Sequence, residues 1–195
     1  MATATATGMT AEEFAAWVQQ PGQRGAFWEL DRGRVVEVPP PQDPHGTLCS
    51  WISHLLWAFA IQRGRGRVAS NDMGLIVEER PDTVRGVDVM FFDESLALGA
   101  IVPGYPRHRP ALVVEVWSPN DRRNAMNRRV AQYLNRGIPL VWLVDPDDQT
   151  VAVHRPGEIP LVAHGAELLL GYDALPDLTF AAANLFNFPG TAPAA

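Results

Sequence analysis

Apolar residues recur at helical spacing in three segments of the chain, and each segment is predicted to form a helix. The first, residues 10–20, opens with a threonine and a glutamate at the spacing of a capping box. The second, residues 45–63, is the longest and is followed by two glycines that end it. The third starts after Ser118, an N-cap residue followed by proline, and reaches residue 136.

Short apolar runs between these helices predict β-strands, and the first two flank a hairpin turn at Asp31-Arg32-Gly33. Gly and Pro break the stretch 96–109 into a loop, whereas 161–188 suggests short strands or turns and one terminal helical turn. This mixture predicts an α/β or α+β domain, a sheet with helices on its faces. The predicted strands are 27–30, 34–38, 67–70, 75–77, 87–92, 111–117, 140–144 and 150–154.

The length of 195 residues fits one domain. We expect residues 9–189 to form it, between a disordered leader at 1–8 and a loose tail at 190–195. No apolar run approaches the length of a membrane span, and the N-terminus lacks the features of a signal peptide. The single cysteine, Cys49, cannot form an internal disulfide. We therefore expect no membrane partner and, by default, a cytoplasmic protein.

Two acidic residues, Asp88 and Glu115, each interrupt a buried apolar strand. A carboxylate in such surroundings either takes up a proton or pairs with a cation. Two acids on neighbouring strands would offer oxygen ligands to a hard cation. The alternative from the residues alone, an ordinary pair of strand-end charges or structural ion pairs, is equally compatible with this pattern.

Hydrolysis of a phosphodiester requires a positioned water and a neutralised phosphoryl charge, which a divalent ion on two or three oxygens supports. Mg²⁺ suits such a site because it keeps several waters, and Mn²⁺ is expected to substitute for it. Asp88 and Glu115 would bind this ion, and the backbone carbonyl of Val116 would add a third ligand. The pattern thus favours a metal-dependent phosphodiesterase.

No lysine is available to assist this chemistry, because all basic side chains apart from histidine are arginines. Trp117 stands two residues after Glu115, where a lysine would be useful. Arg129 lies on the third predicted helix, at the edge of its apolar face, and could reach back over the strand end that carries Glu115. An arginine cannot act as a general base, but it binds phosphate and offsets developing charge. The alternative role for Arg129 is a salt bridge with Glu115.

Other basic residues are weaker candidates. The net charge of -6 argues against a protein that simply coats nucleic acid. Three arginines at 63, 65 and 67 fit either phosphate contacts or a solvated loop. Arg107 and Arg109 precede the Glu115 strand, so we expect them nearer the proposed site and better placed to contact substrate. Ser118 is a further weak candidate for substrate binding.

The sequence resembles the Uma2 family of restriction-endonuclease-like proteins, a branch of the nuclease superfamily with a P-D…(D/E)-x-K motif. The resemblance runs from about Met9 to Phe188, and the order and spacing of its pieces make it specific. The matching pieces are Met9 to Phe14, Glu29 to Gly33, Pro40, His45-Gly46, Val87 to Val89, Leu112 to Pro119, Tyr133, Gly137 and Trp142 to Pro146.

This resemblance implies a restriction-endonuclease-like core, Mg²⁺ bound by Asp88 and Glu115, DNA cleavage, and a homodimer. It also implies that the catalytic lysine has moved to the following helix, at the position that Arg129 occupies here. Glu29 matches a family acid near the metal, and His45 matches a family histidine. Because an arginine replaces the lysine, a second hypothesis is a degenerate nuclease domain that binds nucleic acid or a protein without cutting.

Overall fold

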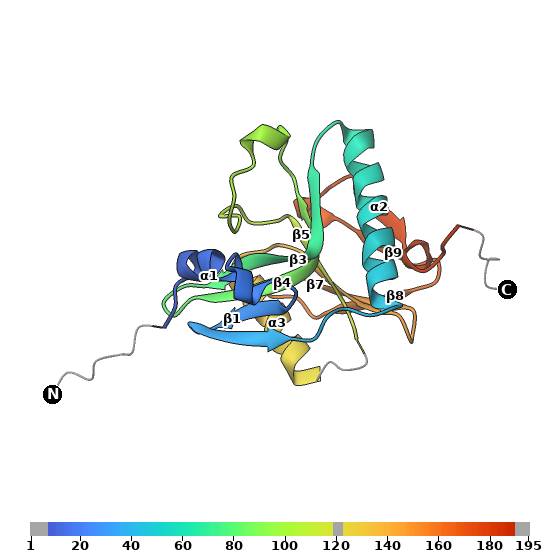
Figure 1. Ribbon diagram of the computed structural model, residues 1–195. Coiled ribbons are helices and arrows are strands. Elements are labelled where there is room, and N and C mark those ends of the chain that lie inside the picture. Colours follow the sequence, from blue (N-terminus) through green and yellow to red (C-terminus); the bar gives the residue numbers. More distant parts are fainter. Residues whose placement is uncertain (1–7, 119–122, 190–195) are drawn as a thin grey trace.

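The computed structural model describes residues 8–118 and 123–189, and within them a mixed eight-stranded sheet forms the centre of the molecule (Figure 1). The order is β2-β1-β4-β5-β6-β7-β8, with β3 paired to β4 beside this path, and only β5 and β6 are parallel. The predicted fold class is therefore confirmed. The strands are β1 Phe27–Asp31, β2 Arg34–Val38, β3 Arg67–Glu78, β4 Thr83–Phe92, β5 Leu112–Val116, β6 Val141–Asp145, β7 Thr150–His154 and β8 Leu161–His164.

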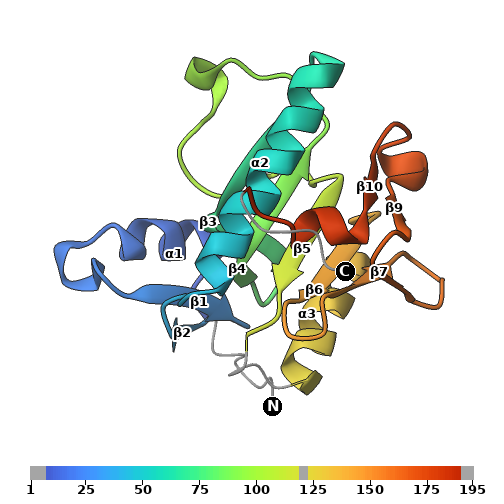
Figure 2. The same ribbon diagram turned by 90° about the vertical axis from the view of Figure 1, so that its right-hand side faces the viewer.

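Two helices cover opposite faces of this sheet, because the central strands β4 and β5 present apolar side chains in both directions. The helix α2, His45–Arg63, packs on one face around the buried ring of Trp142. The helix α3, Arg123–Asn135, packs on the other face around Tyr133. Figure 2 looks onto α2, with α3 behind the sheet. The short helix α1, Ala11–Val18, closes the β1 end of the sheet.

The C-terminal part adds a small two-stranded sheet next to α2. Its strands are β9 Leu168–Leu170 and β10 Thr179–Ala181, and a 3₁₀ turn, Ala182–Leu185, follows them. Further 3₁₀ turns are Pro21–Gln23, Leu98–Ala100 and Tyr172–Ala174. None of the described helices is long and apolar enough to cross a membrane.

The local signals at the N-terminal end of the domain have the expected structures. Thr10 Oγ1 accepts a hydrogen bond from Glu13 N, and Glu13 Oε2 accepts one from Thr10 N, which completes the capping box. The hairpin between β1 and β2 turns on Arg32 and Gly33, with φ of 50° and 75°. Both values are positive, as a two-residue type I′ turn requires. Gly8, expected in the leader, lies against Gly33, while residues 1–7 and 190–195 lie outside the described part of the chain.

Two predicted strand boundaries differ clearly from the structure, and one predicted helix start is not tested by it. The runs 67–70 and 75–77 belong to one strand, β3, because a bulge between Ser70 and Met73 absorbs the polar residues that separate them. The strand β4 starts at Thr83, four residues before the predicted start, since Thr83 is buried against Glu78. The predicted N-cap of the third helix depends on residues 119–122, which lie outside the described residues.

Candidate functional site

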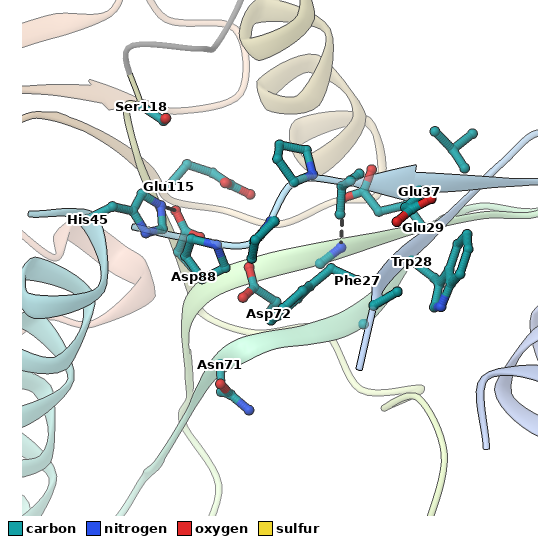
Figure 3. Close-up of a pocket in the computed structure, with 18 of the residues that line it drawn as sticks. Phe27, Trp28, Glu29, Glu37, His45, Asn71, Asp72, Asp88, Glu115 and Ser118 are labelled. Atoms are coloured by element: carbon teal, nitrogen blue, oxygen red, sulfur yellow. Dashed lines mark hydrogen bonds and ion pairs between the residues drawn. The ribbon is translucent and has the colours of Figure 1, made fainter. Parts of the chain in front are cut away.

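The register of β4 on β5 brings Asp88 and Glu115 together. Val89 pairs with Val114 in an antiparallel ladder, so the next step of the same register sets Asp88 opposite Glu115. Side chains directly opposite each other lie on the same face, with Cβ atoms about 4.5–5.5 Å apart. Both residues are buried, at 7% and 4% exposure, and Figure 3 shows them adjacent. The sequence predicted this convergence of two acids from separate apolar runs.

Hydrogen bonds from two different elements hold the carboxylate of Asp88. The backbone N–H of Val116 lies 2.7 Å from Oδ2, so the side chain of one strand caps the backbone of the next. His45 Nε2 lies 3.1 Å from the same oxygen. Because His45 is the first residue of α2, this contact ties the helix start to the sheet. Asp88 is thereby fixed in the middle of β4, next to Glu115 (Figure 3).

The surroundings of Glu115 disfavour its charged form. Burial raises the pKa of this carboxyl well above its ordinary value, and the charge of Asp88 raises it further. Arg129 and a short hydrogen bond from the Tyr133 hydroxyl oppose this shift. The positive charge of Arg129 is too small to neutralise the carboxylates of both Asp88 and Glu115. A divalent cation between them would supply it, so the donor set fits a hard metal ion.

Arg129 lies beside this pair, but its hydrogen bonds go to another acid. Its guanidinium donates from Nη2 to Glu29 Oε1 at 2.7 Å and from Nη1 to the Gly86 carbonyl at 3.2 Å. Burial alone would lower the pKa of Arg129, yet the nearby charges of Glu115 and Glu29 outweigh burial and raise it. Arg129 thus lies near Glu115, as predicted. The predicted salt bridge with Glu115 is wrong, because the guanidinium forms its ion pair with Glu29 instead.

Glu29 is the centre of a buried ion network. Besides Arg129, it accepts from Arg85 Nη1 at 3.1 Å and from the Gly86 N–H at 3.0 Å. Arg85 also donates to Asp31 Oδ1 at 2.5 Å and to Gln132 Oε1 at 3.0 Å. Glu29 is only 4% exposed, although charged residues on hairpin strands usually face solvent. Its geometry is that of a residue that positions Arg129.

These residues line one side of a cavity of about 1400 Å³. The cavity also contains Val116, His45 and Ser118 from the predicted set, and Figure 3 shows Ser118 next to Glu115. Its wall carries more acids than bases, which repels a bare phosphate and attracts cations. A phosphate group would approach this wall with a cation present or at one of its two arginines, Arg24 and Arg129. The acidic lining residues are Glu29, Glu37, Asp43, Asp72, Asp88, Glu115 and Asp147.

Arg107 and Arg109 lie elsewhere, so their expected closeness to the acids is wrong. Both line a separate cavity of about 480 Å³ before the start of β5. Arg109 precedes the first residue of that strand, whereas Glu115 is next to its last residue. Arg107 instead forms an exposed ion pair with Glu12 at 2.6 Å. The structure thus gives neither residue a place beside Asp88.

The arginines at 63, 65 and 67 also form ion pairs with acidic residues of the domain. Arg63 and Arg65 both bind Asp93 at 2.8 Å, and Arg67 binds Glu94 at 2.8 Å. These pairs join the end of α2 and the start of β3 to the residues after β4. Their role as phosphate contacts stays a prediction, and their structural role in the fold is evident.

The sequence reading missed Asp72, a further acid in the same cavity. Asn71 and Asp72 have φ of 68° and 53°, and they form the bulge in the middle of β3. Left-handed backbone is costly for residues other than glycine, and such strain is concentrated at functional sites. The bulge directs Asp72 into the cavity beside the acidic pair (Figure 3). The sequence did contain a signal for this bulge, an Asn-Asp pair between two apolar runs, because asparagine and aspartate tolerate left-handed backbone better than most residues.

Burial raises the pKa of Asp72, and the charge of Asp88 raises it further. Because the carboxyl of Asp72 has a higher pKa in the folded protein than in the unfolded chain, the unfolded chain releases this proton at a lower pH. The free energy of unfolding therefore decreases as pH rises from the unfolded-state pKa through the folded-state pKa. Asp72→Asn removes this loss and keeps a residue that tolerates the backbone. We expect the variant to unfold at a higher urea concentration than the native protein at pH 7, with the difference vanishing below the unfolded pKa. A lower midpoint at pH 7 would contradict this.

Comparisons with known proteins agree with this architecture. Residues 11–183 match the model of a family described as "Uma2: Putative restriction endonuclease". The fold is also similar to the crystal structure of "a putative nuclease belonging to DUF820" from Anabaena variabilis ATCC 29413. That similarity has a TM-score of 0.74 and 20% identity, and it covers 91% of this chain and 97% of the other. None of the curated proteins matched the chain.

Proposed function

Because the chain belongs to the Uma2 family, we propose that it is a Mg²⁺-dependent endonuclease that hydrolyses phosphodiester bonds in DNA. One observation carries the proposal: two buried carboxylates, Asp88 and Glu115, face each other across neighbouring strands at the wall of a large cavity. The proposal includes the homodimer that the family resemblance implies and the cytoplasmic location expected by default.

Asp88, Glu115 and the backbone carbonyl of Val116 would hold the ion. When bound, it would polarise the phosphoryl group and lower the pKa of an attacking water. His45 and the N–H of Val116 orient Asp88, since both contact its Oδ2. Tyr133 orients Glu115 through the bond to its Oε1. The protein thus arranges the acids before any substrate arrives, which lowers the cost of assembling the site.

Arg129 would bind the phosphoryl oxygens and offset their charge in the transition state. Glu29 holds this guanidinium at the cavity wall, and Arg85 in turn neutralises the second oxygen of Glu29. Glu29 is therefore a positioning residue in this account. Because an arginine stays protonated, the proton of the attacking water would leave through solvent.

Supercoiled plasmid provides the test of this function. We expect metal-stripped protein to leave the plasmid intact and to nick it after addition of Mg²⁺ or Mn²⁺, with loss of activity in a chelator. Gel electrophoresis separates the nicked from the supercoiled form. Cleavage that continues in excess chelator would refute the metal dependence, and intact plasmid in both metals would refute the nuclease proposal.

A catalytically degenerate domain that binds nucleic acid or a protein without cutting is the second candidate. The observation that favours it is the engagement of Arg129, whose two terminal nitrogens already donate to Glu29 and to the Gly86 carbonyl. If these bonds persist in the complex, fewer of the five N–H groups of the guanidinium are left to bind the phosphoryl oxygens. Retention of plasmid on a gel without any nicking would support this candidate.

The substitution Arg129→Lys tests how much the arginine limits the rate. A lysine can keep an ion pair with Glu29 through one donor while its compact ammonium also contacts the attacking water. We expect the nicking rate in Mg²⁺ to rise about tenfold, equal to about 1.4 kcal/mol. Arg128→Lys, at the exposed neighbouring position, is the matched control and should leave the rate unchanged. An unchanged or lower rate for Arg129→Lys would mean that residue 129 does not replace the family lysine.

A further inference from the structure

A different set of metal-binding side chains meets Asp88 at the start of α2. His45 and Cys49 lie four residues apart on this helix, so both point from the same face. Cys49 Sγ lies 3.6 Å from His45 Nδ1, and His45 Nε2 lies 3.1 Å from Asp88 Oδ2. One ligand atom from each of the three residues lies within 4.8 Å of the others. A nitrogen, a sulfur and an oxygen donor thus surround one point.

The chemistry of these donors selects a different metal from the acid pair. Thiolate and imidazole bind borderline-soft ions such as Zn²⁺ and Co²⁺, whereas Mg²⁺ requires oxygen. Around tetrahedral zinc, bonds of about 2.0–2.3 Å separate the ligand atoms by about 3.3–3.7 Å. The three donor atoms lie within 4.8 Å of one another, so shifts of about 1 Å would bring them into this range. Three protein ligands and one water are a common zinc coordination.

The same three residues also resemble a Cys–His–Asp nucleophilic arrangement, but the cysteine is in the wrong state for it. Burial raises the pKa of the Cys49 thiol, and the charges of Asp88, Asp72 and Glu115 raise it further. An activated nucleophile needs the opposite, a lowered thiol pKa. Zinc ligation also requires the thiolate, so a metal would have to displace the thiol proton. What favours ligation is the geometry, because three different donor atoms converge within 4.8 Å.

We propose that His45, Cys49 and Asp88 form a zinc-class metal site that shares Asp88 with the Mg²⁺ site. Since the two ions would lie close together and draw on the same carboxylate, occupancy by Zn²⁺ excludes Mg²⁺. The site would therefore inhibit cleavage when zinc is available. This inhibitory role rests on the proposed nuclease function, whereas the existence of the site does not.

Co²⁺ is the probe for this site, because a cobalt–thiolate bond absorbs in the near ultraviolet. Cys49 is the only cysteine of the chain, so the band can come from no other residue. We expect metal-stripped protein to develop the band with one equivalent of Co²⁺ and to lose it when Zn²⁺, but not Mg²⁺, is added. His45→Ala should weaken Co²⁺ binding at least about 100-fold. His54→Ala, at an exposed position of the same helix, is the control and should behave as the native protein.

Two spectroscopic results would overturn the proposal. One is the absence of the band in native protein at excess Co²⁺. The other is a band that stays equally strong in His45→Ala and in Asp88→Asn, because cobalt would then bind the thiol without the site. If the native protein nicks DNA, Zn²⁺ should inhibit it and Cys49→Ser should resist this inhibition, each measured against the variant's own rate in Mg²⁺. A protein that never nicks DNA would refute the nuclease proposal and leave the cobalt band to decide the site.

Discussion

Asp88→Asn should lower the rate of plasmid nicking in Mg²⁺ by about 1000-fold, equal to about 4 kcal/mol of transition-state stabilisation. The carboxylate is one of two proposed side-chain ligands, and a neutral amide binds Mg²⁺ much more weakly. The amide oxygen can still accept the hydrogen bond from Val116 N, so the fold should survive. Nicking rates of the two purified proteins, with circular dichroism spectra to verify folding, check this expectation.

Asp93→Asn is the matched control for this experiment. Asp93 directly follows β4 but binds Arg63 and Arg65, and it lines the smaller cavity instead of the one that holds Asp88. Its substitution should leave the nicking rate within about threefold of the native rate, since no substrate or ion contact is lost. Equal nicking by native protein and Asp88→Asn would identify the activity as a contaminant.

Arg85→Met should lower the free energy of unfolding by about 3–5 kcal/mol, because it leaves the buried charge of Glu29 with only one of its two guanidinium partners and removes the partner of Asp31. Arg85 is buried at 5% exposure and neutralises Glu29 and Asp31 together. Methionine has a similar length and preserves the apolar packing of the stem. Urea denaturation followed by tryptophan fluorescence measures the change.

Arg107→Met provides the comparison at an exposed ion pair. The side chains of Arg107 and Glu12 are 79% and 63% exposed, and solvent screens such pairs. We expect a change below about 1 kcal/mol for this variant. The double variant Arg85→Met with Glu29→Gln should recover part of the stability lost in Arg85→Met alone. Similar losses in Arg85→Met and Arg107→Met would show that the network around Glu29 contributes little.

The acidic pair was predictable because its signal is local. Asp88 and Glu115 each stand out against the apolar residues on both sides in the chain. An acid in a buried strand requires an explanation wherever it occurs, and two such strands next to each other place their acids together. The central sheet, its helices and the first hairpin followed from equally local patterns, and the structure confirms them.

The network around Arg129 was not predictable, because its partners are distant in sequence. Glu29 is 100 residues from Arg129 and 56 from Arg85. Before the sheet order is known, Glu29 and Glu115 are equally good acids for one guanidinium, and nothing in the chain ranks them. Asp72 was hidden for a different reason. Its bulge looks in the sequence like a gap between two strands, and only the backbone conformation shows that one strand continues through it.

Mn²⁺ soaked into crystals of the native protein would show whether the two acids bind a metal ion, because its anomalous scattering locates the ion. We predict a peak between the carboxylates of Asp88 and Glu115, with metal–oxygen distances of about 2.0–2.3 Å. A crystal with saturating Mn²⁺ and no peak between these two side chains would contradict the account.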